Sequence, residues 1–249
     1  MSISGIQSQN TYTALASGYR INSAADDAAG LSISEKLTAQ ENGYNVASRN
    51  AQDGISLINV TDGALSGMQD SLQRIHELAV KSMNGFYSDS DRGAIQAEID
   101  QLKQSIQATA KGTTFNTLKP LDGSMADIQL ATNPEGGGLE IQLENSTLES
   151  LGIADFDVTG DFNLDDIKNA MEKISKARSG LGAQSNALEH TIRNNDYTSY
   201  NTTAANSRLK DTDYGEEIIK RNRDKLLQNY RIFGIKAKKE ADAGILQLF

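Results

Sequence analysis

The sequence predicts a mainly α fold, an elongated antiparallel helical bundle or coiled coil with a small β-hairpin subdomain. Three observations predict it. Apolar residues recur every three, four or seven positions over several long stretches, as on one face of a helix. Only two prolines occur in 249 residues, which favours long helices. One central stretch instead alternates apolar and polar residues, as paired strands do.

The longest periodic stretch runs from Asn45 to about Asn84. As one continuous helix it would be ~60 Å long at 1.5 Å per residue. Helix propensity alone contributes little in water, so such a rod needs partners along its apolar stripe. The first half of the predicted helix seam is this stripe, made of Ile55, Ile58, Leu65, Met68, Leu72 and Ile75.

The chain before this rod is polar and contains few apolar residues. Residues 1–18 carry only Ile3, Ile6, Tyr12 and Leu15 as large apolar side chains, too few to hold a helix alone. We expect a helix to start at Ser23, with Asp26 and Asp27 near the positive end of its dipole. Paired carboxylates also perform acid–base catalysis, but no histidine, lysine or further acid lies nearby, so a helix start is favoured. Asn42-Gly43 is a predicted break.

A second, shorter helix follows the rod. Asn84-Gly85 marks the end of the rod, and Asp89 or Ser90 is the expected cap of the next helix, which ends at Lys111-Gly112. The short turn predicts that the two helices are antiparallel neighbours. The apolar seam of the second helix consists of Ile95, Ile99, Leu102 and Ile106.

Residues 113–160 change in character and predict the hairpin region. Residues 127–130 and 139–143 alternate apolar with polar side chains around a turn that contains Pro134 and three glycines. A phosphate-binding loop is the alternative for this glycine run, but neither a Lys-Ser/Thr pair nor a helix follows it. Residues 148–162 add an apolar patch that we expect to pack the hairpin against the helices.

Helical periodicity returns at Leu164 and continues almost to the end of the chain. Seven-residue spacing held this long indicates a coiled-coil seam, with Arg178 and Ser185 as its polar positions. The polar stretch 194–207 predicts a weakened or mostly exposed helix. This second half of the seam consists of Ile167, Met171, Ile174, Leu181, Leu188 and Ile192.

One more helix is expected at the carboxyl end. Residues 211–213 supply its cap, and it should run to about Asp242, before an apolar tag at 245–249. Its apolar side chains are Ile218, Ile219, Leu226, Leu227, Tyr230, Phe233 and Ile235. Terminal segments too thin to bury such stripes alone predict assembly with copies of the same chain.

Composition excludes several classes of function. The net charge of −9 argues against nucleic acid as a partner, because nucleic-acid-binding proteins present a basic face to phosphates. The absence of cysteine excludes disulfides and zinc-thiolate sites. No apolar run approaches the ~18 residues of a membrane-spanning helix, so we expect no membrane insertion. No secretory signal peptide is visible at the start.

No constellation of catalytic residues is visible in the sequence either. The two histidines, His76 and His190, are each alone within a predicted helix and have no partner four residues away. Both are interpreted as solvated or seam-edge residues. We therefore predict no enzyme activity, no cofactor and no metal site.

Four ordered blocks of sequence resemble a known family. Residues 16–31 contain Ser17-Gly18-Tyr19-Arg20-Ile21-Asn22 and Asp26-Asp27-Ala28-Ala29-Gly30-Leu31, and residues 50–57, 72–85 and 207–214 supply further blocks. Together they resemble bacterial flagellin over nearly the whole chain. The resemblance implies a structural subunit of the bacterial flagellar filament, secreted to the cell exterior, self-assembling and supporting motility.

The resemblance also implies a division of the chain. Residues 1–40 and 208–249 would be the terminal, inner-tube-like helical segments, and residues 41–207 the helical shell domain with the hairpin region 113–160. The variable outer domain of the family looks absent, because a helix follows Leu151-Gly152-Ile153 closely. Only 25 residues precede the Asp26-Asp27 block, which predicts a shortened amino-terminal segment. The last helix is more charged than the family pattern, and buried charges are costly unless paired.

The resemblance also implies binding partners. These are the chain itself, the flagellar export chaperone, the cap and hook-junction proteins, and a host Toll-like receptor. By resemblance the receptor would contact Gln73, Arg74, Leu78 and Glu98. In the alternative interpretation, Leu78 belongs to the helix seam and Arg74 pairs with Glu77 or another subunit. The alternative function is a minor or specialised secreted flagellin that acts mainly as a ligand for this receptor or another partner.

Overall fold

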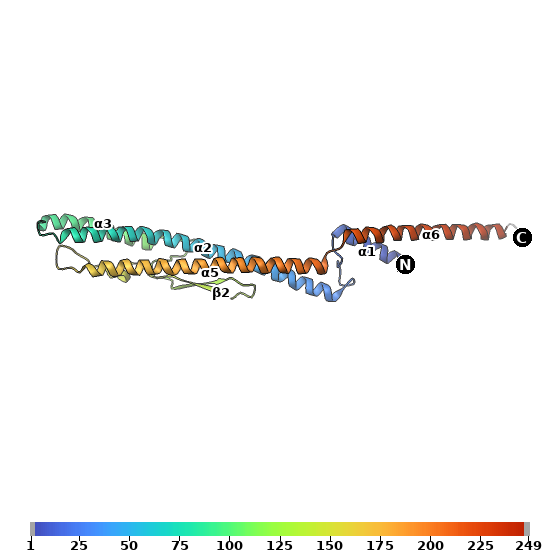
Figure 1. The fold of residues 1–249 in the computed structure, drawn as a ribbon, viewed down its shortest axis with the longest axis horizontal. Helices are drawn as coiled ribbons and strands as arrows, with labels where there is room; N and C mark the ends of the chain where they lie inside the picture. Colours follow the sequence, from blue (N-terminus) through green and yellow to red (C-terminus); the bar gives the residue numbers. More distant parts are fainter. Residues whose placement is uncertain (1–2, 247–249) are drawn as a thin grey trace. The chain divides into compact units, whose positions relative to one another are not determined.

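The computed structural model describes the backbone of residues 3–246 and the side chains of residues 10–240. It confirms the mainly α fold with one small hairpin (Figure 1). The elements in chain order are α1 (Ile3–Ser17), α2 (Ala28–Ser82), α3 (Asp89–Gly112), β1 (Asp127–Ala131), β2 (Gly138–Gln142), α4 (Leu148–Leu151), α5 (Leu164–Lys210) and α6 (Tyr214–Leu246).

The chain forms two compact units. The first contains residues 1–41 and 199–249, and the second contains residues 42–198. Both α2 and α5 contribute residues to each unit. The assignment of the terminal segments to an inner tube and of the central residues to a shell stays a prediction.

The predicted break at Asn42-Gly43 is wrong, because α2 is one uninterrupted helix of 55 residues. A glycine weakens a helix but is tolerated where another segment needs to come close. A Cβ atom on Gly43 would lie only 2.7 Å from the Cβ of Pro134 in the hairpin turn. Gly43 therefore admits the hairpin against α2.

The start of α2 also differs from the prediction. Asp27, not Ser23, caps the helix, because its Oδ1 accepts a hydrogen bond from Gly30 N at 2.8 Å. Asp26 instead closes the preceding turn, where its Oδ2 accepts bonds from Asn22 N and Ser23 N at 3.1 and 2.9 Å. These bonds, the one from Asn22 first, lower the pKa of Asp26 below its usual value.

The predicted seam lies in the core of the second unit, which α2, α3, α5 and the hairpin region build. Its long central side chains, such as Leu72, Ile75 and Ile167, have no exposed surface. Nine seam residues are buried, namely Ile58, Leu65, Met68, Leu72, Ile75, Ile167, Ile174, Leu181 and Leu188; Ile55, Met171 and Ile192 are partly buried and pack against them.

The cap of α3 is Ser88 rather than Asp89 or Ser90. Ser88 and Asp91 form a capping box, in which Asp91 N donates to Ser88 Oγ and Ser88 N donates to Asp91 Oδ2. The bond from the Ser88 hydroxyl is the largest cause that lowers the pKa of Asp91. Of the expected seam of this helix, Ile95, Ile99 and Ile106 are buried and Leu102 is half-buried.

We expect the Asp91→Asn variant to lose part of the acid sensitivity of folding. The folded pKa of Asp91 lies below 3.8, its ordinary value, so its contribution is present above pH 3.8 and is lost as the pH falls through the folded pKa. As the pH is lowered through 3.8, the thermal unfolding midpoint should fall less steeply for Asp91→Asn than for the parent chain. Asp89→Asn, outside the box, is the matched control, and equal slopes for all three proteins would contradict the prediction.

The hairpin forms as predicted. β1 and β2 are antiparallel with Leu130 opposite Leu139 and Ile128 opposite Ile141. The segment that follows, which begins with α4, packs into the same core through Leu151, Ile153 and Val158. Its backbone is held by α3, since Val158 N donates to Gln96 Oε1 at 2.9 Å and Lys103 Nζ donates to Phe156 O at 3.1 Å.

α5 continues without weakening through the polar stretch 194–207 that we expected to be weak or exposed. Hydrogen bonds replace apolar packing there. In the second unit Asn195 Nδ2 donates to Thr132 O at 2.9 Å and Ser48 Oγ donates to Asp196 Oδ1 at 3.0 Å. In the first unit Ser34 Oγ donates to Asn206 Oδ1 at 2.7 Å. The expected exposure is nevertheless confirmed in large part, since seven of the fourteen residues are exposed and only Asn195 and Ser199 are buried.

Residues 3–17 form α1, which does not stand alone. α1 packs against α6, so tertiary contact stabilises it. The turn after α1 is fastened to the turn after α5, since Arg20 N donates to Lys210 O at 2.7 Å and Thr212 N to Gly18 O at 3.0 Å. Gly18 has a φ of +78°, which favours glycine. The side chains of Ile3 and Ile6 lie outside the described residues.

The cap of α6 is as predicted, because Asp213 Oδ1 accepts bonds from Gly215 N and Glu216 N at 2.8 and 3.2 Å. The helix ends at Leu246 instead of Asp242. The side chains of the predicted apolar tag, residues 245–249, lie outside the described residues.

Candidate assembly surface

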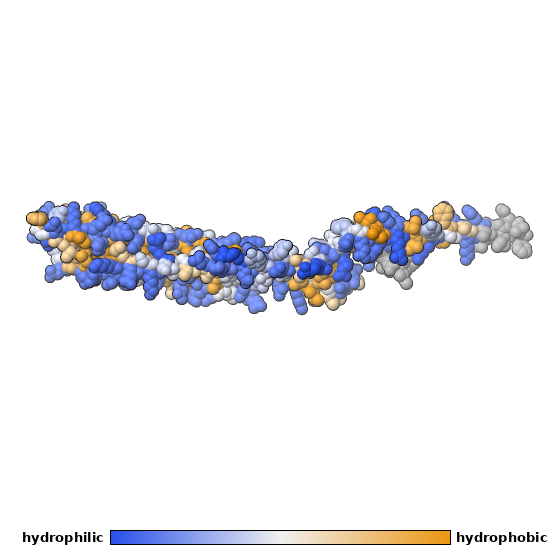
Figure 2. All heavy atoms as spheres, viewed as in Figure 1, coloured by the Kyte–Doolittle hydropathy of each residue, from blue (hydrophilic) through white to orange (hydrophobic). Residues whose placement is uncertain are grey.

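Many of the exposed large apolar side chains among the described residues lie on α6, where Figure 2 shows hydrophobic residues at the surface. Ile219, Leu226, Tyr230 and Phe233 are spaced seven, four and three residues apart and form one stripe of the helix. These four residues, called the α6 stripe below, are 57–73% exposed. Apolar stripes of this kind are normally buried against a partner.

The opposite side of α6 is polar and faces the rest of its own unit. Glu217, Arg221, Asp224 and Gln228 repeat at four, three and four residues and are the half-buried positions of this helix. The element that packs against α6 is α1, and within its described side chains, residues 10–17, the buried ones are the small Thr11 and Ala14. The helix therefore turns its polar side inward and leaves the stripe in solvent.

Other apolar side chains surround the second half of α6. Leu227, Ile232 and Ile235 lie off the α6 stripe and are 45–60% exposed. A helix that is apolar on several sides is typically buried within a larger assembly. α6 thus has surface for partners on more than one side.

The charges of α6 are partly neutralised within the helix. Lys220 Nζ lies 3.0 Å from Glu216 and 3.4 Å from Glu217. The bond to Glu216 is the first cause that raises the pKa of Lys220. These ion pairs lower the free-energy cost of burying Lys220 in an assembly, a cost that the charged sequence of this helix had indicated.

The residues predicted to contact a receptor separate into two groups. Gln73, Arg74 and Glu98 are exposed, whereas Leu78 is only 2% exposed and lies in the core. The prediction that Leu78 belongs to the receptor surface is therefore corrected. Its side chain packs in the core beside the α2 seam, as in the alternative interpretation. Arg74 donates to Glu98 Oε1 from Nε and NH2 at 2.9 and 2.8 Å, and to Glu77 at 3.2 Å. The bond to Glu98 is the largest cause that raises the pKa of Arg74.

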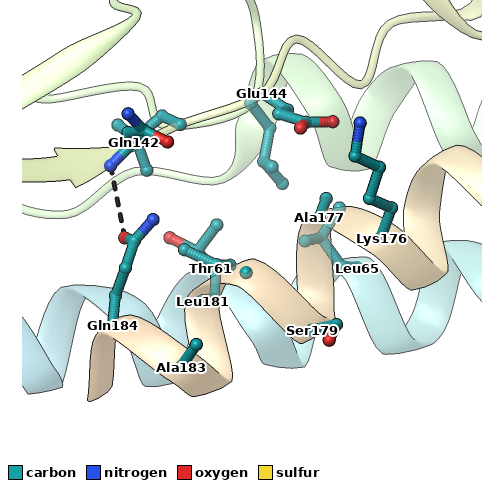
Figure 3. Close-up of a pocket in the computed structure, with 13 residues that line it drawn as sticks. Thr61, Leu65, Gln142, Glu144, Lys176, Ala177, Ser179, Leu181, Ala183 and Gln184 are labelled. Carbon is teal, nitrogen blue, oxygen red and sulfur yellow. Dashed lines mark hydrogen bonds between the residues drawn. The ribbon is translucent and has the colours of Figure 1, made fainter. Parts of the chain in front are cut away.

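A hollow of about 420 Å³ lies between the hairpin, α2 and α5 (Figure 3). Its floor is apolar and includes Leu65 and Leu181, and Glu144 and Lys176 stand at its rim. Gln142 N donates to Gln184 Oε1 across it at 3.2 Å. These groups include no nucleophile paired with a base, so the hollow provides no catalytic constellation.

The two histidines are separate, as predicted. His76 is half-buried on α2, and His190 on α5 is exposed, with its Nδ1 3.0 Å from Arg193 NH2. Among the described residues, no three His, Cys, Asp or Glu side chains gather as metal ligands. Across the same part of the chain, each helix is too short or too polar to cross a membrane.

Long helices that leave an apolar stripe uncovered define the class of protein, a subunit built to assemble. The comparisons agree with this class. The model for the bacterial flagellin N-terminal helical region matches residues 2–126, and that for the C-terminal helical region matches residues 164–234. The chain belongs to the bacterial flagellin family.

Individual relatives give the same result. The chain is 40% identical to a flagellin of Halalkalibacterium halodurans, over 100% of this chain and 94% of that protein. It is 34% identical to a flagellin of Bacillus subtilis, over 97% and 92% of the two chains. The crystal structure of Bacillus cereus flagellin is similar with a TM-score of 0.52 and 26% identity, over 59% of this chain and 88% of that one.

Sequence reasoning named the apolar residues of the last helix without selecting them as a functional site. The signal that could have selected them is the seven-four-three spacing of the α6 stripe on a helix whose other stripe is charged. The spacing alone does not tell which stripe faces α1.

Proposed function

We propose that the chain is a structural subunit of the bacterial flagellar filament and polymerises with copies of itself outside the cell to support motility. The observation that carries the proposal is the exposed α6 stripe on a helix whose polar side faces α1. Family membership supports it, since the Brachyspira hyodysenteriae relative, 36% identical, is a flagellar filament core protein.

The α6 stripe is large enough to offset much of the cost of association. Burying one large apolar side chain contributes ~1.5–3 kcal/mol, so covering the four residues of the α6 stripe is comparable with the ~4–15 kcal/mol cost of association. A second copy is a suitable partner because each copy presents two unlike apolar surfaces on α6, the α6 stripe and the exposed residues Leu227, Ile232 and Ile235 on its other sides. Contacts between unlike surfaces of identical copies propagate into open filaments.

We expect the Tyr230→Asp variant to lose filament formation by at least ~10-fold in the polymerised fraction, since a charge in an apolar contact costs well over 1.4 kcal/mol. Asn229→Asp is the matched control, because the neighbouring side chain is exposed, polar and gains the same charge. Sedimentation and electron microscopy under polymerising conditions measure both. The circular dichroism of all three proteins shows whether the subunit remains helical.

Two outcomes of this experiment would contradict the proposal. The first is a parent chain that remains monomeric under all polymerising conditions while its helices are intact. The second is full polymerisation of Tyr230→Asp, which would show that the α6 stripe is not covered in the filament.

We further propose, from the family resemblance, that the export chaperone and the cap and hook-junction proteins bind this chain, and that a host Toll-like receptor binds its monomer. The exposed Gln73, Arg74 and Glu98 support the receptor contact. We expect Arg74→Ala to reduce receptor activation in a reporter-cell assay by roughly 10-fold, as for loss of a central interface arginine. Arg193→Ala, on an exposed face of α5, is the control, and equal activation by both variants would refute this contact.

A further inference from the structure

The turn between α2 and α3 contains an Asn-Gly pair whose surroundings differ from those of the other Asn-Gly pair in the chain. Asn84 and Gly85 are both exposed and lie outside any helix or strand. Asn42 and Gly43 are the same two residues in the same order but lie inside α2. The two pairs therefore share their local chemistry and differ in backbone conformation.

We propose that Asn84 is a site of spontaneous, self-catalysed modification, in which its side-chain amide is converted to a carboxylate through a cyclic imide. The backbone nitrogen of Gly85 attacks Cγ of Asn84, and a new N–C bond closes a five-membered succinimide ring. The bond from Cγ to the side-chain nitrogen breaks, and the nitrogen leaves as ammonia with the proton from Gly85 N. Water then opens the ring at either carbonyl to give aspartate or isoaspartate.

The structure meets the requirements of this attack at Asn84. Gly85 N donates to no acceptor within the part of the chain that the structure describes, so the nucleophile is not engaged in a backbone bond. Gly85 has no side chain to shield it, and an added Cβ would meet no heavy atom within 4 Å. The turn thus leaves the attacking nitrogen accessible to water and base.

The electrophile, Cγ of the Asn84 side chain, is activated by a hydrogen bond. Asn84 Oδ1 accepts a hydrogen bond from Phe86 N at 3.1 Å, which folds the side chain back over the Gly85 peptide. A donor on the carbonyl oxygen withdraws electron density from Cγ, which increases its susceptibility to attack.

Asn42 does not meet these conditions, because it lies inside a helix. Gly43 is an interior residue of α2, so its N–H is committed to the helical hydrogen bond and its φ and ψ are fixed. Its position is further confined by Pro134, which packs against it. Ring closure at Asn42 therefore requires local unfolding of α2, whereas Asn84 reacts from the folded chain.

The reaction adds one negative charge to the turn between α2 and α3. Asn84 follows the carboxyl end of α2, the negative end of its helix dipole, and precedes Asp89 and Asp91 at the start of α3. The isoaspartate product also lengthens the backbone of the turn. Subunits should accumulate this change with age, because no enzyme is needed to produce it.

The test is incubation of the purified, folded full-length chain at mildly alkaline pH, followed by peptide mass spectrometry. We expect the amide-to-acid mass change, with isoaspartate, to accumulate at Asn84 at least ~10-fold faster than at Asn42, the ratio set by the opening of α2. In denaturant the two sites should react at similar rates. The Gly85→Ala variant, for which the turn has room, should slow the reaction at Asn84 and leave its fold unchanged.

Three results would overturn the proposal. One is equal conversion of Asn42 and Asn84 in the folded chain, and another is conversion of Asn84 only after denaturation. The third is an unchanged rate in Gly85→Ala with no isoaspartate, since this would exclude the cyclic imide. None of these outcomes depends on whether the chain forms filaments.

Discussion

Replacement of Leu72 with aspartate is expected to unfold the helices of the second unit. Leu72 has no exposed surface and lies in the middle of the α2 seam, next to Ile75 and Met68. An unpaired carboxylate at a fully buried position costs at least ~4 kcal/mol, most of the ~5–15 kcal/mol by which a domain is stable. Far-ultraviolet circular dichroism should show a large loss of helix at ambient temperature.

The adjacent residue supplies the control for this prediction. Gln73 is exposed, so Gln73→Asp introduces the same charge into the same turn of α2 without burying it. Its effect on the free energy of unfolding should stay within ~0.5 kcal/mol. Unchanged helix content in Leu72→Asp would show that the α2 seam is not the core of the unit.

Replacement of Gly54 with leucine is expected to separate the hairpin from α2. Gly54 is buried, and even a Cβ there would overlap the side chain of Leu130 and lie 3.2 Å from Ile141 and 3.3 Å from Leu188. Overpacking of this kind costs ~1–3 kcal/mol, because the ends of these three side chains have to shift and leucine adds three further carbon atoms beyond Cβ. Chemical denaturation measures the lost stability, and hydrogen exchange of the hairpin amides localises it.

Gly63→Leu is the matched control within the same helix. No heavy atom lies within 4 Å of a Cβ at Gly63, so the new side chain projects into open space. Both variants gain ~1 kcal/mol of helix propensity, so their difference isolates the overlap with the hairpin. Equal stability of the two variants would contradict the close approach of the hairpin to α2.

Local patterns predicted the elements whose signals lie within a few residues. The seam of α2 and α5 follows from spacing because one stripe of a long helix has to be buried, and Leu72 and Ile167 are in the core accordingly. The hairpin follows from alternation around a turn rich in glycine. Asp213 caps α6 as its position before a periodic stretch indicated.

The differences from the predictions have two physical causes, distant packing partners and local cap geometry. Gly43 lies inside a helix and leaves room for Pro134 of the hairpin turn, and Asn195 is buried where Thr132 O accepts its hydrogen bond. Ser88 and Asp27 cap their helices in place of neighbours that are chemically equivalent in sequence. Such choices depend on backbone geometry that composition does not carry.

By itself, the sequence determined the helical class, the seam, the hairpin and the family, because these depend on periodicity and on ordered blocks of residues. Only the tertiary structure decided which side of α6 faces α1, that Leu78 is buried and Arg74 exposed, and that α1 is a helix. The physical reason is that a helix with two candidate stripes buries the one its neighbour contacts. The α6 stripe remains in solvent because α1 packs against the polar side.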